Sequence, residues 1–281
     1  MTNSTQLRQC ADPIGVFDSG VGGLSVLRAL RAELPLEPFV YIADSGHAPY
    51  GERDDSHIIA RSHAITRYLL EHHHIKALVV ACNTATAAAI QRLRQDFPEL
   101  PIVGIEPALK PAASNSKTKH IGVLATRGTL NSEKFRALLA SLQDQAHFVV
   151  QPCDGLADAI ERDDAIKTEA LCAYFTRAMG QFGLNPGEMD TLVLGCTHYP
   201  FAIGVLHASV GEAVVFLEGG APVARQTRRL LEARSWLATQ GAPVARAAST
   251  VFGTTGNAGQ LQSAIARWLQ MTSDVQTLSI T

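Results

Sequence analysis

The sequence lacks any run of apolar residues as long as the roughly 20 that a membrane-spanning helix requires. Residues 1–12 are polar and lack the apolar segment of a secretory signal peptide, so we expect them to form a flexible leader. An excess of one charge is also missing, because the formal net charge is −2. The charge therefore gives no reason to expect nucleic acid or an anionic membrane as a partner, and a cytoplasmic location is expected.

Cysteine is scarce, and the five cysteines show no CxxC spacing. An odd number without paired spacing indicates neither a disulfide framework nor a zinc site, and we expect the thiols to be reduced. Three adjacent histidines at 72–74 point in different directions at the end of a predicted helix, where they complement its negative terminus. They are not interpreted as a metal site.

The chain does contain a regular alternation of short apolar runs and longer amphipathic segments. Such alternation predicts an α/β protein with mostly parallel sheets flanked by helices. A length of 281 residues with 46% hydrophobic residues suits two globular domains. Expected strands include 14–17, 40–43, 77–80, 101–105 and 120–124, and expected helices include 24–34, 56–71, 85–94, 131–142 and 258–269.

The most informative stretch is residues 77–85, where a valine-rich run stops at a cysteine and an alanine-rich helix begins. This places Cys82 at the carboxyl end of a buried strand and the amino end of a helix. Ligands bind at that edge of open α/β sheets, and a helix N-terminus stabilises a thiolate. The same pattern returns at residues 191–199, around Cys196.

The two cysteine turns belong to an internal repeat. The strand at Ile14 and the strand at Ile121 are 107 residues apart, while the two cysteines are 114 residues apart. We therefore expect two similar domains related by pseudo-twofold symmetry, with both cysteines facing one cleft between them. The expected division is residues 13–107 plus 221–281 for the first domain and 108–220 for the second, with a chain crossing near 218–222.

Two thiols across a cleft can act on opposite faces of one carbon, because a thiol is easily poised between acid and base near neutral pH. One removes a proton and the other delivers one, which is the chemistry of a racemase. Each cysteine has a candidate helper for proton transfer, Asp18 near Cys82 and His198 two residues after Cys196.

Other interpretations remain open from the residues alone. Any one cysteine is most often a small core residue, which is our expectation for Cys172 and Cys153. A Cys/His hydrolase built on Cys196 and His198 would leave the duplicated turn unexplained. A disulfide redox pair would usually show CxxC spacing. Residues 18–23, DSGVGG, do not match GxGxxG, so their glycines are expected to close around a small ligand, with Asp18 alternatively a helix N-cap.

Four motifs in order carry a resemblance that spans the chain from about Ile14 to the last helix. They are DSGVGGL at 18–24, PYG at 49–51, ACNTA at 81–85 and GCTHYP at 195–200. Together they resemble glutamate racemase, a family within the aspartate/glutamate racemase superfamily. One departure is Glu218, where the family more often has an aspartate followed by a small residue.

The resemblance implies that Cys82 and Cys196 are the two proton donors and acceptors, assisted by Asp18 and His198. A further acid is expected near Cys196, for which Glu161 is preferred and Asp158 is the alternative. The implied substrate contacts are Asp18, Ser19, Tyr50, Gly51, Asn83, Thr84, Thr197 and His198, and the internal repeat adds Thr126 as the counterpart of Ser19.

The resemblance further implies interconversion of L- and D-glutamate without cofactor or metal, supplying D-glutamate for peptidoglycan. The expected partner is therefore the small-molecule substrate, and a homodimer is left open. Alternatives are aspartate racemase or another enzyme of the superfamily, including one of the arylmalonate decarboxylase type that needs a single cysteine. A regulatory binding protein that keeps the cleft without turnover is an alternative from another class.

Overall fold

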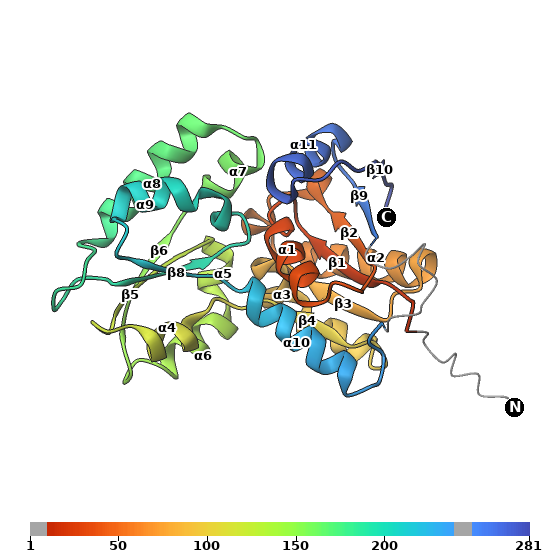
Figure 1. The fold of residues 1–281 in the computed structure, drawn as a ribbon, viewed down its shortest axis with the longest axis horizontal. Helices are drawn as coiled ribbons and strands as arrows, with labels where there is room; N and C mark the ends of the chain where they lie inside the picture. Colours follow the sequence, from red (N-terminus) through yellow and green to blue (C-terminus); the bar gives the residue numbers. More distant parts are fainter. Residues whose placement is uncertain (1–9, 239–248) are drawn as a thin grey trace, which may run out of the picture.

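The computed structural model describes residues 10–238 and 249–281. The first nine residues of the expected leader lie outside the described ranges. Figure 1 shows two lobes side by side, each a sheet with helices on both faces. In the described part of the chain, no helix is both long and apolar enough to cross a membrane.

The first sheet contains six parallel strands in the order β10-β9-β2-β1-β3-β4. Its central strands are buried on both faces, as expected of valine- and isoleucine-rich strands in a parallel sheet. The strands are β1 (Ile14–Asp18), β2 (Phe39–Ala43), β3 (Ala77–Val80), β4 (Ile102–Gly104), β9 (Thr250–Thr254) and β10 (Val275–Thr277).

Helices cover both faces of this sheet because alternate strand residues point to opposite sides. Val16 and Tyr41 pack with one group of helices, α1 (Leu24–Glu33), α10 (Gly220–Glu232) and α11 (Ala258–Leu269). Phe17 and Ile42 pack with the other group, α2 (Asp55–His73) and α3 (Asn83–Asp96).

The second sheet has four parallel strands in the order β6-β5-β7-β8. The strands are β5 (His120–Ala125), β6 (His147–Pro152), β7 (Thr191–Gly195) and β8 (Val215–Leu217). One face packs against α7 (Leu156–Glu161), α8 (Ala165–Met179) and α9 (Ile203–Val210). The other packs against α4 (Leu109–Asn115) and α6 (Glu133–Ala140).

The strand order confirms the internal repeat. Strands β2-β1-β3-β4 of the first sheet correspond one by one to β6-β5-β7-β8 of the second. The register agrees as well, since Ile14 pairs with Ala77 and Ile121 pairs with Thr191, which are the positions aligned in the sequence. The two cysteine turns therefore follow equivalent strands, β3 and β7.

Three local expectations differ from the structure. The helix expected at 131–142 is α6 (Glu133–Ala140), which begins at 133 because the Ser132 side chain caps it by accepting a hydrogen bond from the Phe135 N–H, and the short helix α5 (Arg127–Asn131) before it was not predicted. Residues 108–119, for which no helix was predicted, contain α4. Strand β10 was not predicted, because its residues are mostly exposed and lack an apolar pattern.

The chain passes from the second sheet to the helices of the first directly after β8. Residues 218–219 connect β8 with α10, which packs on α1. A second link between the halves is the stack of Phe201 on Trp268, whose ring centroids are 3.8 Å apart with planes 5° from parallel. The domain boundaries given above stay a prediction.

Candidate active site

A cavity of about 310 Å³ lies at the carboxyl ends of β1, β3, β5 and β7. Its lining comes from both halves of the chain, as expected at this edge of parallel sheets. Eleven of the twelve predicted site residues line it: Ser19, Tyr50, Gly51, Cys82, Asn83, Thr84, Thr126, Glu161, Cys196, Thr197 and His198. The two cysteines thus face one cavity from opposite halves.

Cys82 is positioned by the turn between β3 and α3. It is the N-cap of α3, and its sulfur accepts a hydrogen bond from the Ala85 N–H at 3.4 Å. The thiol donates to Ser19 Oγ at 3.6 Å. Burial, together with the negative charge of Asp18, raises the pKa of Cys82 to about 12, so the group is a thiol at neutral pH in the free protein.

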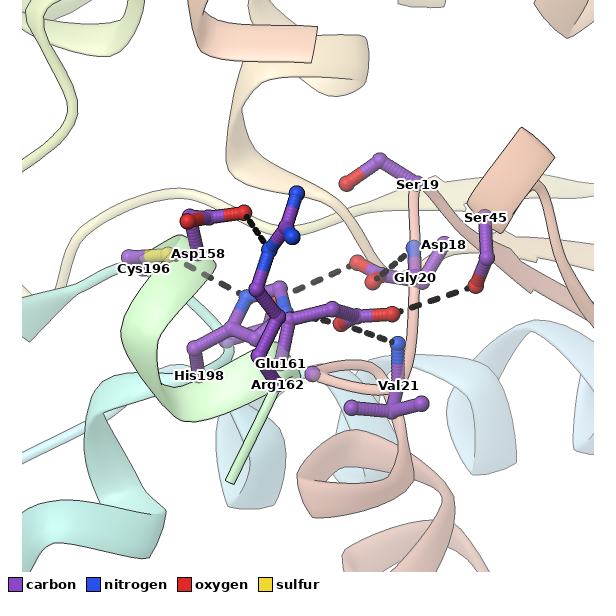
Figure 2. A network of polar contacts seen from close by, with 12 residues as sticks. Asp18, Ser19, Gly20, Val21, Ser45, Asp158, Glu161, Arg162, Cys196 and His198 are labelled. Atoms are coloured by element: carbon purple, nitrogen blue, oxygen red, sulfur yellow. Dashed lines mark hydrogen bonds and ion pairs between the residues drawn. The ribbon is translucent and has the colours of Figure 1, made fainter. Parts of the chain in front are cut away.

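Cys196 has different surroundings, because a histidine stands beside it (Figure 2). The Cys196 sulfur is 3.7 Å from Nδ1 of His198, and Nε2 of the same ring is 2.7 Å from the Glu161 carboxylate. Burial opposes charge on the imidazole, but the hydrogen bonds with Cys196 and Glu161 raise the pKa of His198 well above its ordinary value. The sulfur therefore lies next to a cationic ring.

Glu161, and not Asp158, is the acid that contacts His198. Asp158 is also near the cavity, but its carboxylate pairs with Arg162 at 2.7 Å and with Lys167 at 3.7 Å. The pKa of Glu161 is lowered despite burial, because His198, Val21 and Ser45 all donate to or neutralise its carboxylate. These contacts favour Glu161 over Asp158, and the role of Glu161 in the reaction stays a prediction.

The Glu161 carboxylate also joins the two halves of the molecule. It belongs to α7 in the second half, yet it accepts hydrogen bonds from the Val21 N–H at 2.8 Å and from Ser45 Oγ at 3.1 Å in the first (Figure 2). Gly20 leaves the space for this contact, because a Cβ atom there would lie 2.4 Å from Glu161 Oε2.

Asp18 is the predicted residue that does not line the cavity. Its side chain is fully buried, and its carboxylate accepts hydrogen bonds from the Gly20 N–H at 2.9 Å and from Thr197 Oγ1 at 3.1 Å. Burial raises its pKa, which the charge of His198 partly offsets. Asp18 therefore lies behind the residues that line the cavity, and its expected contact with the substrate stays a prediction.

The loop that carries Tyr50 and Gly51 is held from behind by a buried carboxylate. Asp44 accepts a 2.6 Å hydrogen bond from the Tyr50 hydroxyl and two hydrogen bonds from Arg61, at 2.9 and 3.0 Å. Although burial disfavours its charge, these donors lower the pKa of Asp44. The Tyr50 hydroxyl is thus already hydrogen-bonded within the protein. Gly51 lies close to Thr126 of the other half, since a Cβ atom at Gly51 would be 3.3 Å from the Thr126 side chain.

Hydroxyl and amide groups complete the cavity. Thr84 Oγ1 from α3 lies 3.2 Å from Thr126 Oγ1 at the start of α5, so the two halves touch here too. Asn83 Oδ1 is buried and has no hydrogen-bond partner within the described residues. Such groups, together with the N-termini of helices, suit the binding of carboxylates.

Sequence reasoning missed Ser45 and Gln260, which both line the cavity, and treated Cys153 as structural although it does as well. Ser45 lies in a loop whose proline, aromatic and glycine content could have suggested a role. Gln260 comes from α11, which gave no signal. Across residues 10–238 and 249–281, no group of three or more His, Cys, Asp or Glu side chains is arranged to hold a metal ion.

Comparisons with known proteins identify the family of the chain. The sequence profile of the Asp/Glu/Hydantoin racemase family matches residues 23–226. The chain is 50% identical over 243 residues to a glutamate racemase of Ectopseudomonas mendocina, and the matched region covers 85% of this chain and 90% of that relative.

Solved structures give the same result for the whole chain. The glutamate racemase isoform RacE1 of Bacillus anthracis is 30% identical, with a TM-score of 0.80 over 96% of this chain and 98% of that one. The Escherichia coli glutamate racemase, solved with L-glutamate and the activator UDP-MurNAc-ala, is 30% identical, with a TM-score of 0.79 over 96% and 99%. The chain belongs to the Asp/Glu/hydantoin racemase family and, within it, to the glutamate racemases.

Proposed function

We propose that the protein interconverts L- and D-glutamate by proton transfer at Cα between Cys82 and Cys196. The observation that supports this most is that the two thiols line one cavity from equivalent turns of the repeated halves. A thiolate on one side removes the Cα proton and is left as a thiol. The thiol on the other side gives its proton to the opposite face of the resulting carbanion and is left as a thiolate.

This reaction needs no change in the total number of protons on the two sulfurs. The cavity starts with one thiol and one thiolate and ends with the two exchanged, so no oxidant, reductant or bound cofactor is consumed. The elevated pKa of Cys82 favours the thiol there in the free protein. The ring of His198 lies 3.7 Å from the Cys196 sulfur, within reach for exchanging a proton with it.

Substrate binding is assigned to the groups around the two sulfurs. We infer that hydroxyls and amides of the lining hold the two carboxylates of glutamate: Ser19, Asn83, Thr84, Thr126 and Thr197, with the backbone at Gly51. The unpartnered Asn83 Oδ1 is an acceptor, which suits the substrate ammonium group. The negative charge of Asp18 behind the wall favours the same cation.

The test is isotope exchange in D₂O with the purified protein and a panel of amino acids. We expect deuterium at Cα and loss of optical rotation for glutamate, since each removed proton is replaced from a thiol that exchanges with solvent. Turnover of aspartate but not glutamate would contradict the substrate assignment. A lack of turnover despite ligand binding would favour the non-catalytic alternative.

Cys82→Ser and Cys196→Ser test the two-cysteine step, because serine keeps the shape of the side chain and is a far weaker acid. Each variant should lose racemisation by at least about a thousandfold, while Cys172→Ser, in the core of α8, keeps it. Full activity in either active-site variant would rule out the mechanism.

The cellular role inferred is the supply of D-glutamate for peptidoglycan in the cytoplasm. A bacterial strain that requires D-glutamate should grow without it when it expresses the protein, and not when it expresses Cys82→Ser.

A further inference from the structure

The end of α7 is held by the first half of the molecule. We call residues 161–163 the α7 corner. The Glu161 side chain of this corner touches His198 and the first half, as described above, and Asp163 adopts a φ of 60° that ends the helix. Whatever fixes the corner therefore also fixes the position of the Glu161 carboxylate.

Gln260, in the first turn of α11, contacts the corner directly. Its side-chain Nε2 donates a 2.7 Å hydrogen bond to the backbone carbonyl of Glu161. That carbonyl is among the last of α7 and so has no partner within the helix. Gln260 is half-buried and lines the cavity, so its donor approaches Glu161 from the side of the active site.

The same helix reaches the second half at two further points. Arg267 forms an ion pair with Asp163 through both guanidinium nitrogens. Trp268 stacks on Phe201, in the 3₁₀ turn η3 (Tyr199–Ala202) that directly follows His198. α11 thus contacts both segments that carry the Glu161–His198 pair, although it lies in the other half of the molecule (Figure 1).

The charge on His198 depends on the position of Glu161. The charged or titratable groups that face its ring are Cys196, Glu161 and Asp18. Of these, Glu161 is the one whose backbone is held by α11. If the Glu161 carboxylate moves away from Nε2, it stabilises the imidazolium less, and a smaller fraction of the His198 rings beside the Cys196 sulfur is protonated.

We propose that Gln260 is a positioning residue, which holds the Glu161 carboxylate against His198 through the Glu161 carbonyl. Arg267 supports the same corner through Asp163. This inference rests on the proposed function, because it concerns the proton-transfer partner of Cys196. It makes α11, remote in sequence from every motif, part of the machinery that sets the charge of the site.

The experiment compares Gln260→Met with Gln262→Met. Methionine keeps the length of the side chain and removes the N–H donor. Gln262 lies on the same helix but is exposed, and its Nε2 bonds Ser273 O at 3.2 Å, so it is a matched control. Each protein is assayed for kcat and KM across pH, and the ring of His198 is titrated by NMR, with its signal assigned from its loss in His198→Asn.

Gln260→Met should move the basic limb of the kcat profile to lower pH by about half a unit, because His198 loses its proton more readily. On the basic side this is about a threefold loss of kcat, with KM little changed. Arg267→Met should produce a smaller shift in the same direction, since its ion pair is exposed. The NMR titration of His198 should move with the kinetic limb.

Two results would overturn the inference. One is a Gln260→Met profile and His198 titration that coincide with those of Gln262→Met. The other is a lower melting temperature without any shift of the limb, which would make the contact structural only. Failure of the proposed function is seen separately, as a wild-type protein that does not racemise glutamate, and the NMR titration tests the hold on His198 even then.

Discussion

The two thiols of the cavity are the same chemical group in unlike surroundings. Cys82 has a hydroxyl and a helix N-terminus beside it and a buried carboxylate nearby, whereas Cys196 has a histidine that is paired with Glu161. The absence of a side chain at Gly20 is needed for the position that Glu161 takes beside His198. Gly20 lets the Glu161 carboxylate reach the Val21 N–H, because no side chain stands between them.

Gly20→Ala should therefore lower activity more than stability. The new methyl group would lie 2.4 Å from Glu161 Oε2, so the carboxylate must leave Val21 and weaken its contact with His198. Loss of a charge-assisted hydrogen bond of this kind corresponds to about tenfold or more in kcat. Polarimetric assays and urea unfolding measure the two effects.

Gly204→Ala is the matched control, because a Cβ atom at Gly204 in α9 meets nothing within 4 Å. It should leave kcat unchanged and raise the free energy of unfolding by about 0.5–1 kcal/mol, as alanine favours a helix. Equal kcat values for Gly20→Ala and Gly204→Ala would contradict the role given to Gly20.

At the residue scale, the sequence predicted most of the polar and cysteine residues that line the cavity at its centre, because the motif residues follow strands that end at one edge. It failed where the role depends on contacts between distant segments. Nothing in the order of residues shows that the Tyr50 hydroxyl turns to Asp44, that Asp18 lies behind the wall, or that Gln260 reaches Glu161.

Among the elements, the loop after β2 shows how a substrate-facing segment is fixed by buried charge. Arg61 of α2 binds Asp44 with two hydrogen bonds and also donates to the Ile280 carbonyl at 2.6 Å. Thr255, after β9, bonds the other side of the Asp44 carboxylate at 2.8 Å. Helix α2, the end of β9 and the C-terminal segment therefore meet at one carboxylate, which holds the loop in place.

Arg61→Met should destabilise the protein strongly, because it leaves Asp44 buried without its cation. Breaking a buried ion pair in this way typically costs about 3–5 kcal/mol in the free energy of unfolding, measured by urea denaturation. Arg92→Met removes an exposed pair with Asp96 and should change stability by less than about 1 kcal/mol.

The pH dependence gives a second check on the same network. The pKa of Asp44 is lower in the folded protein than its ordinary value, so its contribution to stability is present above that ordinary value of 3.8 and is lost as pH falls through the folded value. The stability difference between wild type and Arg61→Met should thus shrink in acid. A constant difference from pH 7 to pH 2 would argue against the Asp44 assignment.

Elements were predicted well where burial gives a clear pattern and poorly where it does not. The buried strands and helix α11 lie close to their expected positions, because a strand buried on both faces is a short continuous apolar run, whereas apolar residues recur every three to four positions in an amphipathic helix. The exposed β10 has no such pattern, and the break at Ser132 depends on a single cap.

The whole molecule consists of two repeated sheets whose site belongs to neither half alone. Polar contacts join the halves at the cavity, including Thr84 with Thr126 and Glu161 with Val21, and the stack of Phe201 on Trp268 joins them outside it. The mostly parallel strands and the internal repeat were readable in the sequence, whereas the order of the strands in each sheet comes from the structure. How closely the halves approach was not, because that depends on side chains that meet only in the folded protein.

Glutamate should accordingly stabilise both halves together. A ligand that contacts residues of both sheets adds about 2.7 kcal/mol of stability at a concentration one hundred times its dissociation constant. Hydrogen exchange should slow in α3 of the first half and in η3 and α7 of the second, with Asn83→Ala weakening both effects. Protection confined to one half would contradict a shared site.

The unlike surroundings of Cys82 and Cys196 have a consequence for the kinetics of the proposed mechanism. Each turnover leaves the protein with its single shared proton on the other sulfur, so the protonation form of the free protein depends on which enantiomer it released last. It can accept the same enantiomer again only after that proton has returned through solvent. This return does not depend on substrate concentration, so in the proposed mechanism it sets an upper limit on the rate of net conversion in one direction, and the free protein cycles between two forms that differ only in the place of a proton.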